Sequence, residues 1–335
     1  MVLLTVLLQL RSTTLAQDVK KVGTSAAIFL RIPVGARGTS MGSAYVSMAD
    51  DPSAMFWNPG GIPRVNDYSL IVDHSPWLPG LQFNYFGVIL PFQTAGTVGI
   101  NVTALTTNEM DITTPDQPMG TGEKFDATSI AVGMAYGRNL TDRFSMGATV
   151  KYVQERILNS SATGVAFDVG SIYDTPFAGI RLGFSISNFG PKMQMYGEDL
   201  NVRVDIDPTQ EGNNQSITGR LNTDKFDMPL IMRVGLSWDA LKSEMSRLTL
   251  AVDGLNPNDN GQSVNLGAEY AFYKETLLLR GGFNELFLEE REKGLTFGVE
   301  INTLIQGGLR VRAGYAFQDF EHLGSINRFT FALQF

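Results

Sequence analysis

The sequence of 335 residues contains no cysteine and only two histidines. The absence of cysteine excludes a disulfide framework, thiolate metal ligands and a cysteine nucleophile. The histidines, His74 and His322, do not stand at the spacing that a zinc site requires. The sequence therefore predicts no metal site and no cofactor.

Charged residues and long apolar runs are also scarce. Charged residues make up 18% of the chain and the net charge is -8, without a long basic run that could displace counterions from phosphates. This excludes nucleic acid as a partner. After residue 16, no apolar run approaches the roughly 20 residues that a membrane-spanning helix needs. If the chain crosses a membrane, it does so with strands.

The first 16 residues form an apolar run that ends with Thr14, Leu15 and Ala16. Small residues at this point are typical of the cleavage site of an export signal. A basic stretch before the apolar run is missing, so a buried N-terminal helix is the alternative interpretation. We predict a signal peptide at residues 1–16.

Glycine and aromatic residues are abundant, with 35 Gly, 21 Phe and 10 Tyr, a composition typical of β proteins. From Asp67 onwards, about fourteen strand-like segments are separated by turn signals. Each is close to the roughly nine to eleven residues of one tilted membrane crossing. The predicted strands are 67–74, 81–91, 95–105, 127–138, 143–156, 164–174, 180–189, 228–238, 247–255, 262–273, 276–285, 294–304, 309–318 and 327–335.

The predicted strands alternate bulky apolar residues with small or polar ones. In 143–156, for example, Met146 and Val150 fall on the face opposite Ser145 and Lys151. A β-sandwich or a propeller would alternate as well. However, the polar faces are rich in Gly, Ala and Ser, which is typical of a crowded barrel interior.

The segment 81–91 departs from this alternation because it carries large apolar residues on both faces, among them Phe83, Tyr85 and Phe86. We expect another part of the chain to cover its inner side.

The connections between the predicted strands alternate in length. The two longest, 106–126 and 190–227, both follow odd-numbered strands, whereas the connections after even-numbered strands are short. Outer-membrane barrels alternate short periplasmic turns with longer outer loops in this way. We therefore predict an all-β fold, a transmembrane antiparallel barrel of about fourteen strands over residues 67–335.

Charges of both signs fall on the predicted inner faces. We expect them to pair inside the lumen, either as structural partners around a water-filled interior or as groups with a role in function. They are Lys151, Arg181, Arg233, Arg280, Arg310, Arg312, Asp168, Asp253, Glu269 and Glu300.

The residues before the first predicted strand resemble the N-terminal part of a known protein family. The stretches 23–30, 34–37, 41–46 and 49–61, the last reading A-D-D-P-S-A-M-F-W-N-P-G-G, closely resemble the N-terminal signature of the PorV/PorQ family. These are outer-membrane proteins of the Bacteroidetes and related phyla. The family is similar in turn to the FadL long-chain fatty-acid transporters, fourteen-stranded barrels with an N-terminal hatch that carries an Asn-Pro-Ala motif.

The resemblance implies a hatch, or plug, with small helices over residues 17–66. Asn58 and Pro59 match the first two positions of the hatch motif, and Gly60 stands in place of its alanine. The candidate hatch motif is Trp57, Asn58, Pro59 and Gly60.

The resemblance also implies a function that is not enzymatic. A PorV-like barrel would reside in outer-membrane lipid and assist type IX-type secretion, with secretion-system components and cargo proteins as partners. The long connection 190–227 would then contact cargo. The alternative is a FadL-like channel for long-chain fatty acids or other hydrophobic small molecules, which requires an apolar pocket beside residues 57–59 and an opening in the barrel wall.

The residues offer two other candidate sites, a hydrolase site and a calcium site. A hydrolase would require one of the two histidines to meet a serine and an acid in space, and we predict no catalytic residues. The segment 253–261 is rich in carboxylate and amide oxygens that could hold Ca²⁺, but it lacks EF-hand spacing, which favours an ordinary turn. Trp57, Trp77 and Trp238 fit aromatic anchoring at a membrane interface.

The last predicted strand, 327–335, places Phe331 and Phe335 on one face, and as the closing strand it must pair with 67–74. Phe335 also resembles the terminal signal that outer-membrane assembly machinery reads. We expect Phe335→Asp to lower the amount of folded protein in outer-membrane fractions, with Gln334→Glu, on the opposite face, as the matched control. Unchanged abundance of Phe335→Asp would count against a barrel.

Overall fold

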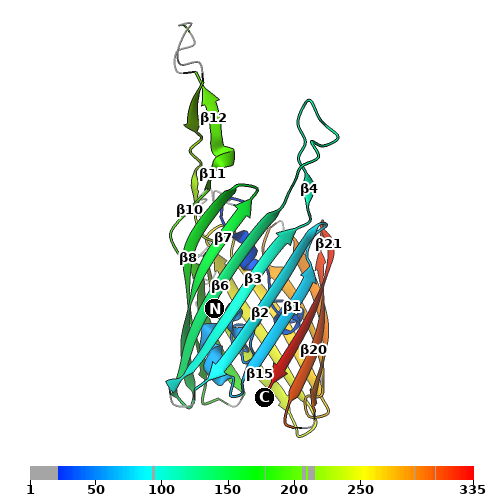
Figure 1. The fold of residues 1–335 in the computed structure, drawn as a ribbon. Coiled ribbons are helices and arrows are strands. Elements are labelled where there is room, and N and C mark those ends of the chain that lie inside the picture. Colours follow the sequence, from blue (N-terminus) through cyan, green and yellow to red (C-terminus); the bar gives the residue numbers. More distant parts are fainter. Residues whose placement is uncertain are drawn as a thin grey trace, which may run out of the picture.

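The computed structural model describes residues 22–335 apart from 93, 94, 178, 206–208, 210–215, 290 and 306. The predicted signal peptide lies outside the described residues. Fourteen antiparallel strands form a closed, tilted barrel (Figure 1). These strands are β1 (Ser69–Pro76), β2 (Leu81–Pro91), β3 (Thr97–Thr107), β6 (Ala127–Thr141), β7 (Phe144–Ile157), β8 (Ser160–Asp174), β9 (Ile180–Phe189), β15 (Ile231–Lys242), β16 (Arg247–Pro257), β17 (Ser263–Phe272), β18 (Leu277–Leu286), β19 (Lys293–Leu304), β20 (Arg310–Phe320) and β21 (Gly324–Gln334).

All fourteen predicted strands are confirmed, with ends that move by no more than four residues. The outer face is apolar, with side chains such as Val150, Leu250 and Phe297 between 41% and 54% exposed. Inner-face residues such as Ser145 and Thr149 are buried. Among the described residues, no helix is both long enough and apolar enough to cross a membrane.

The barrel closes where the first strand meets the last. β1 pairs with β21, with Leu70 opposite Leu333 and His74 opposite Phe329, as the sequence predicts. Inside this seam Arg328 forms a buried ion pair with Asp73, whose second carboxylate oxygen accepts a hydrogen bond from Thr330 at 2.5 Å. The seam is therefore held by side chains as well as by the backbone ladder.

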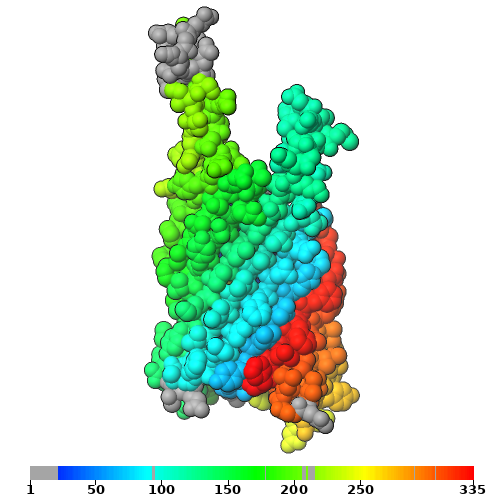
Figure 2. All heavy atoms as spheres, in the orientation of Figure 1, coloured from blue at the N-terminus to red at the C-terminus, as the bar shows by residue number. Residues whose placement is uncertain are grey.

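The two long connections project from the same end of the barrel, opposite the end where β21 finishes (Figures 1 and 2). This agrees with the predicted separation of long loops from short turns. The first arm contains β4 (Met110–Asp111) and β5 (Lys124–Phe125). The second contains β10 (Met193–Gln194), β11 (Tyr196–Gly197), η4 (Glu198–Leu200), β12 (Asn201–Val204), β13 (Ile217–Arg220) and β14 (Lys225–Phe226).

Residues 22–66, which we call the plug, lie inside the barrel. Their helices are short because Gly, Pro and small residues interrupt them: η1 (Ile28–Arg31), α2 (Ala36–Ser40), α3 (Ala54–Trp57) and η2 (Pro59–Arg64). Asn58 caps η2, since its Oδ1 accepts a hydrogen bond from the Gly60 N–H at 3.0 Å and Pro59 takes the first helical position. The lumen is therefore filled rather than open.

The plug supplies the cover that the sequence predicts for 81–91. Phe83 and Tyr85 point into the barrel, where they are 0% and 2% exposed, and they join one buried cluster with Phe29, Leu30 and Val34 of the plug. Apolar residues on both faces of β2 thus meet lipid on one side and the plug on the other.

Glycines let the plug approach the wall very closely at η2. A Cβ added at Gly60 would lie 2.5 Å from the Ser171 Cα of β8, and one added at Gly147 of β7 would lie 2.2 Å from the Pro59 carbonyl oxygen. These are backbone contacts that cannot rotate away. An alanine at position 60, as in the Asn-Pro-Ala motif, does not fit this barrel.

We expect Gly60→Ala to lower the free energy of unfolding by about 1–3 kcal/mol because the added methyl group overpacks the plug against β8. Guanidinium unfolding in detergent micelles measures this change. Gly254→Ala is the matched control, since the nearest atom to a Cβ there is 3.9 Å away. Equal effects of the two substitutions would contradict the close-packing account.

Candidate functional site in the barrel lumen

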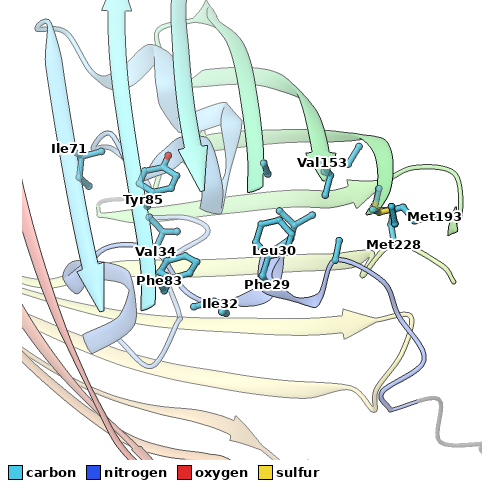
Figure 3. Close-up of a cluster of buried hydrophobic side chains, with 14 of the residues drawn as sticks. Phe29, Leu30, Ile32, Val34, Ile71, Phe83, Tyr85, Val153, Met193 and Met228 are labelled. Carbon is cyan, nitrogen blue, oxygen red and sulfur yellow. The ribbon is translucent and has the colours of Figure 1, made fainter. Parts of the chain in front are cut away.

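A continuous band of buried apolar side chains crosses the lumen (Figure 3). Phe29, Leu30 and Val34 of the plug form its middle. Ile71, Phe83 and Tyr85 of β1 and β2 lie at one end, and Val153, Met193 and Met228 at the other. We call these nine residues the apolar row.

The apolar row ends where the barrel wall is incomplete. β9 leaves β8 at the pair Phe167 and Phe189, after a register shift, whereas β8 continues to Ser160. Within the described part of the chain, only Ser160 and Ser161 find a new ladder partner here, the short β11. Residues 162–166 of β8 have no ladder partner on this side among the described residues. We call this interruption the wall gap.

Side-chain packing rather than a strand paired with β8 closes the wall gap. Met193 and Met228 pack over Gly164, where a Cβ would lie 2.9 Å from Met193 Cγ and 2.6 Å from Met228 Cε. The plug is attached nearby by two backbone donors: Ala26 N–H to the Asp227 carbonyl at 2.9 Å and Ala27 N–H to Glu155 Oε2 at 3.0 Å. The closure is largely apolar.

The candidate hatch motif lies deep in the plug, and all four of its residues are buried. Trp57 Nε1 donates to the Val34 carbonyl at 2.8 Å, which joins the two halves of the plug. Asn58 Nδ2 donates to the carbonyls of Val46 at 2.8 Å and Ser171 at 3.0 Å, which joins the plug to β8. The motif thus fixes the position of the plug.

The expectation of interfacial anchoring is wrong for Trp57, which is 2% exposed, because its ring fills the plug interior. Trp238 does lie on the outer face of β15 and is 44% exposed.

An arginine that has no acidic group of the described residues within 4 Å lies beside Trp57. Arg233 of β15 is 5% exposed, its guanidinium carbon is 5.9 Å from the Trp57 ring centroid, and its Nη1 donates to Ser187 Oγ at 3.1 Å. Its Nε has no partner among the described residues. Phe56, Trp57, Arg233 and Leu255 line a pocket of about 40 Å³ here, room for only a few water molecules.

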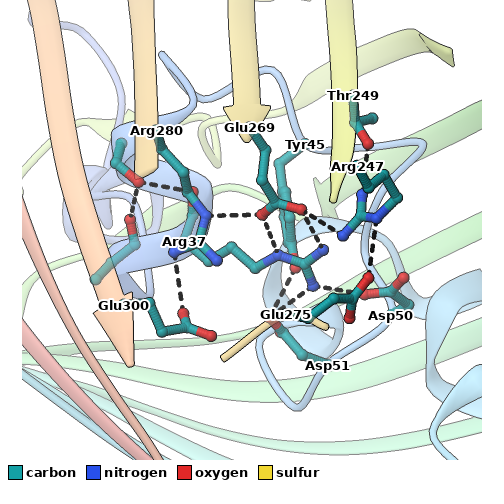
Figure 4. A network of polar contacts seen from close by, with 12 residues as sticks. Arg37, Tyr45, Asp50, Asp51, Arg247, Thr249, Glu269, Glu275, Arg280 and Glu300 are labelled. Atoms are coloured by element: carbon teal, nitrogen blue, oxygen red, sulfur yellow. Dashed lines mark hydrogen bonds and ion pairs between the residues drawn. The ribbon is translucent and has the colours of Figure 1, made fainter. Parts of the chain in front are cut away.

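On β16, β17 and β18, ion pairs hold the plug (Figure 4). The fully buried Glu269 of β17 contacts Arg37 of the plug at 3.0 Å, Arg280 at 2.7 Å and Arg247 at 2.9 Å. Arg37 also contacts Asp50 at 2.6 Å within the plug. Glu269 is therefore the centre of a network that joins plug and wall.

The other predicted lumen charges differ in the partners that they contact. Lys151 contacts Asp168 at 2.8 Å and Arg280 contacts Glu300 at 3.0 Å, whereas Arg181 contacts the unpredicted Asp174 at 2.9 Å.

Asp253 has no basic partner within 4 Å among the described residues; it accepts hydrogen bonds from the backbone N–H groups of Tyr45 and Val46. Arg310 differs from the prediction, because it begins β20 at the rim and is exposed there. Arg312 makes no ion pair with a described residue.

At neutral pH, two plug residues near Glu269 keep the protonation states in which they form these contacts: Asp50 is ionised and Tyr45 is neutral. Burial alone would raise the pKa of Asp50, but Arg37 and Arg181 outweigh it and hold that pKa at about 2. Burial raises the pKa of Tyr45, whose hydroxyl donates to Asp51 Oδ2 at 2.7 Å.

The remaining candidate groups are engaged elsewhere. Asp259 of the segment 253–261 contacts Arg31 at 2.5 Å. His74 lies 2.8 Å from Asn84 and His322 lies 3.3 Å from Glu292, so neither contacts a serine in the described part of the chain. No cluster of three metal-ligating side chains occurs among the residues that the structure describes.

No protein-family model matches the chain, and no curated protein matches its sequence. Solved structures do match its fold. The Ralstonia pickettii toluene transporter TbuX has a TM-score of 0.55 at 13% identity, covering 90% of this chain and 97% of that chain. The Pseudomonas putida toluene transporter TodX has a TM-score of 0.55 at 12% identity, covering 89% and 96%.

A Pseudomonas aeruginosa FadL homologue has a TM-score of 0.50 at 12% identity, covering 90% and 98%. At these identities the likeness shows the fold alone, and this fold is the FadL-like barrel with an N-terminal plug. The PorV/PorQ resemblance finds no support in these comparisons.

We expect Glu269→Gln to lower the free energy of unfolding by about 3–5 kcal/mol, because it leaves buried arginines around a neutral group. Glu321→Gln is the control: Glu321 is 58% exposed and lies 3.9 Å from Arg291, an arrangement worth at most about 1 kcal/mol. Chemical unfolding in micelles measures both, and similar small losses would show that the network does not hold the plug.

Proposed function

We propose that this chain is an outer-membrane channel for hydrophobic small molecules, exported with its signal peptide at 1–16. The observation that carries the proposal is the meeting of the wall gap and the apolar row. An apolar solute dissolves in lipid, so entry through the wall spares it the polar layer outside the membrane. The apolar row then offers it contacts with side chains of its own chemistry.

The solved structures support small apolar cargo, since two of them are named toluene transporters. Arg233 supports a further substrate, the long-chain fatty acid, because its guanidinium lies beside Trp57 and has no carboxylate partner within 4 Å among the described residues, although Asp253 and Asp168 attract it from farther away. A fatty-acid carboxylate would supply that partner.

In this proposal the plug has two parts. Residues 26–34 close the wall gap through apolar contacts, which a solute can replace, and through polar contacts with Asp227, Glu155 and Asp259, which have to open. Residues 35–66 stay fixed by the hatch motif and by the lumen charges around Glu269. A separate cavity of about 410 Å³, lined in the plug by Arg37, Met48, Asp50 and Arg64, is not part of this closure.

A PorV-like role in type IX-type secretion is the second candidate. Two observations favour it: the N-terminal resemblance and the two arms that project beyond the barrel, where secretion components or cargo could bind.

The two candidates separate in a deletion strain. We expect loss of uptake of labelled long-chain fatty acid and toluene, with surface-attached proteins at normal levels. Complementation with the full chain restores uptake. Normal uptake together with lost surface proteins would overturn the channel and favour secretion.

The passage itself can be locked with disulfides, because the chain has no cysteine of its own. Ser25 and Asp227 pair across an isolated parallel bridge, so Ser25→Cys with Asp227→Cys ties residues 26–34 to the wall gap. We expect oxidation to reduce uptake at least about tenfold and a reductant to restore it.

The matched control joins the fixed part of the plug to the wall. A Cβ at Gly314 would lie 3.2 Å from the Ala36 Cβ, so Ala36→Cys with Gly314→Cys forms the second cross-link. We expect it to leave uptake unchanged. Block by both cross-links would mean that the whole plug moves, and block by neither would place the passage elsewhere.

A further inference from the structure

A second, polar cavity lies on the other side of the plug. It has a volume of about 410 Å³ and is lined by residues of β8, β9, β15, β16, β18, β19 and β20. Thr175, Gly179 and Glu275, from short turns, also line it, which places it at the end opposite the arms. Its position and its lining separate it from the apolar row.

The cavity carries more basic than acidic groups. Six basic and five acidic side chains line it. Each of the five carboxylates lies within 4 Å of an arginine; they are Asp50, Asp174, Asp239, Glu275 and Glu300. Among the described residues, Arg312 and Lys242 have no carboxylate at that distance. The cavity therefore presents two basic side chains without an ion-pair partner in contact, although Arg312 attracts Asp50 from farther away.

Arg312 lies next to a second donor. It is the direct cross-strand partner of Asn302, on β20 and β19, and both line the cavity. Neither side chain donates a hydrogen bond to a described residue, and Arg312 Nε is hidden from solvent without a partner. A buried donor left unpaired costs free energy, so a ligand that accepts from it gains affinity.

We propose that Arg312 and Asn302 bind the oxyanion group, carboxylate or phosphate, of a small water-soluble solute that enters from the periplasmic side. A guanidinium beside an amide presents parallel donors that match two oxygens of such a group. A volume of about 410 Å³ leaves room for a small molecule around it. Lys242, on the same cavity, attracts the anion by charge.

The bound anion would lie against the plug, because Arg37 and Asp50 line the same cavity. It would not touch the apolar row. The proposal therefore stands independently of the channel, and uptake of apolar solutes does not test it.

Isothermal titration of the purified full chain in detergent, at low ionic strength, tests the site with inorganic phosphate and with succinate. We expect saturable binding of at least one anion, and a loss of affinity of about tenfold or more in Arg312→Gln. Which of the two binds identifies phosphate or carboxylate as the source. Asn302→Ala should weaken binding by a smaller factor.

Arg310→Gln is the matched control, since it removes the same charge from the same strand at the exposed rim. We expect it to change affinity less than twofold. If Arg312→Gln fails to fold, Arg312→Lys, which keeps the charge and loses the planar donors, and Asn302→Ala decide the question. Absence of binding to the unmodified chain, or equal weakening by Arg310→Gln, overturns the proposal.

Discussion

Every backbone N–H and C=O group that faces lipid must find a partner within the protein, because the hydrocarbon offers none. The fourteen strands satisfy this demand by closing on themselves, and the seam between β1 and β21 is reinforced inside by Asp73 and Arg328. At the wall gap the ladder stops while β8 continues. There the plug and the methionine pair Met193 and Met228 complete the wall.

Two different kinds of interaction hold the plug, namely apolar contacts near the wall gap and ion pairs around Glu269. Apolar contacts near the wall gap can be exchanged for equivalent contacts with an apolar solute at little cost. The ion pairs around Glu269 cannot, because separating Arg37 from it leaves a buried charge without compensation. In the proposed channel, residues 26–34 are the part that a solute displaces, and their polar contacts with Asp227, Glu155 and Asp259 must open as well.

Much of the barrel follows from local sequence. Alternation and turn residues define the strands, and the apolar inner face of β2, with Phe83 and Tyr85, indicates a covering segment. The network around Glu269 does not follow, because Arg37 lies 232 residues away and local patterns carry no information on such pairing. The wall gap depends on a register shift near Asp168, which the alternation of the sequence does not indicate. The sequence around Trp57 likewise does not tell whether its side chain anchors at a membrane interface or is buried.

The central claim is that apolar solutes pass through the wall gap along the apolar row. Anomalous scattering from a brominated hydrocarbon soaked into crystals of the protein tests it most directly. The account predicts bromine beside Phe29, Leu30 and Met193, with residues 26–34 displaced and the contacts of Glu269 unchanged. Bromine found only in the polar cavity would contradict it. A solute bound elsewhere in the barrel, with the packing of residues 26–34 unchanged, would contradict it as well.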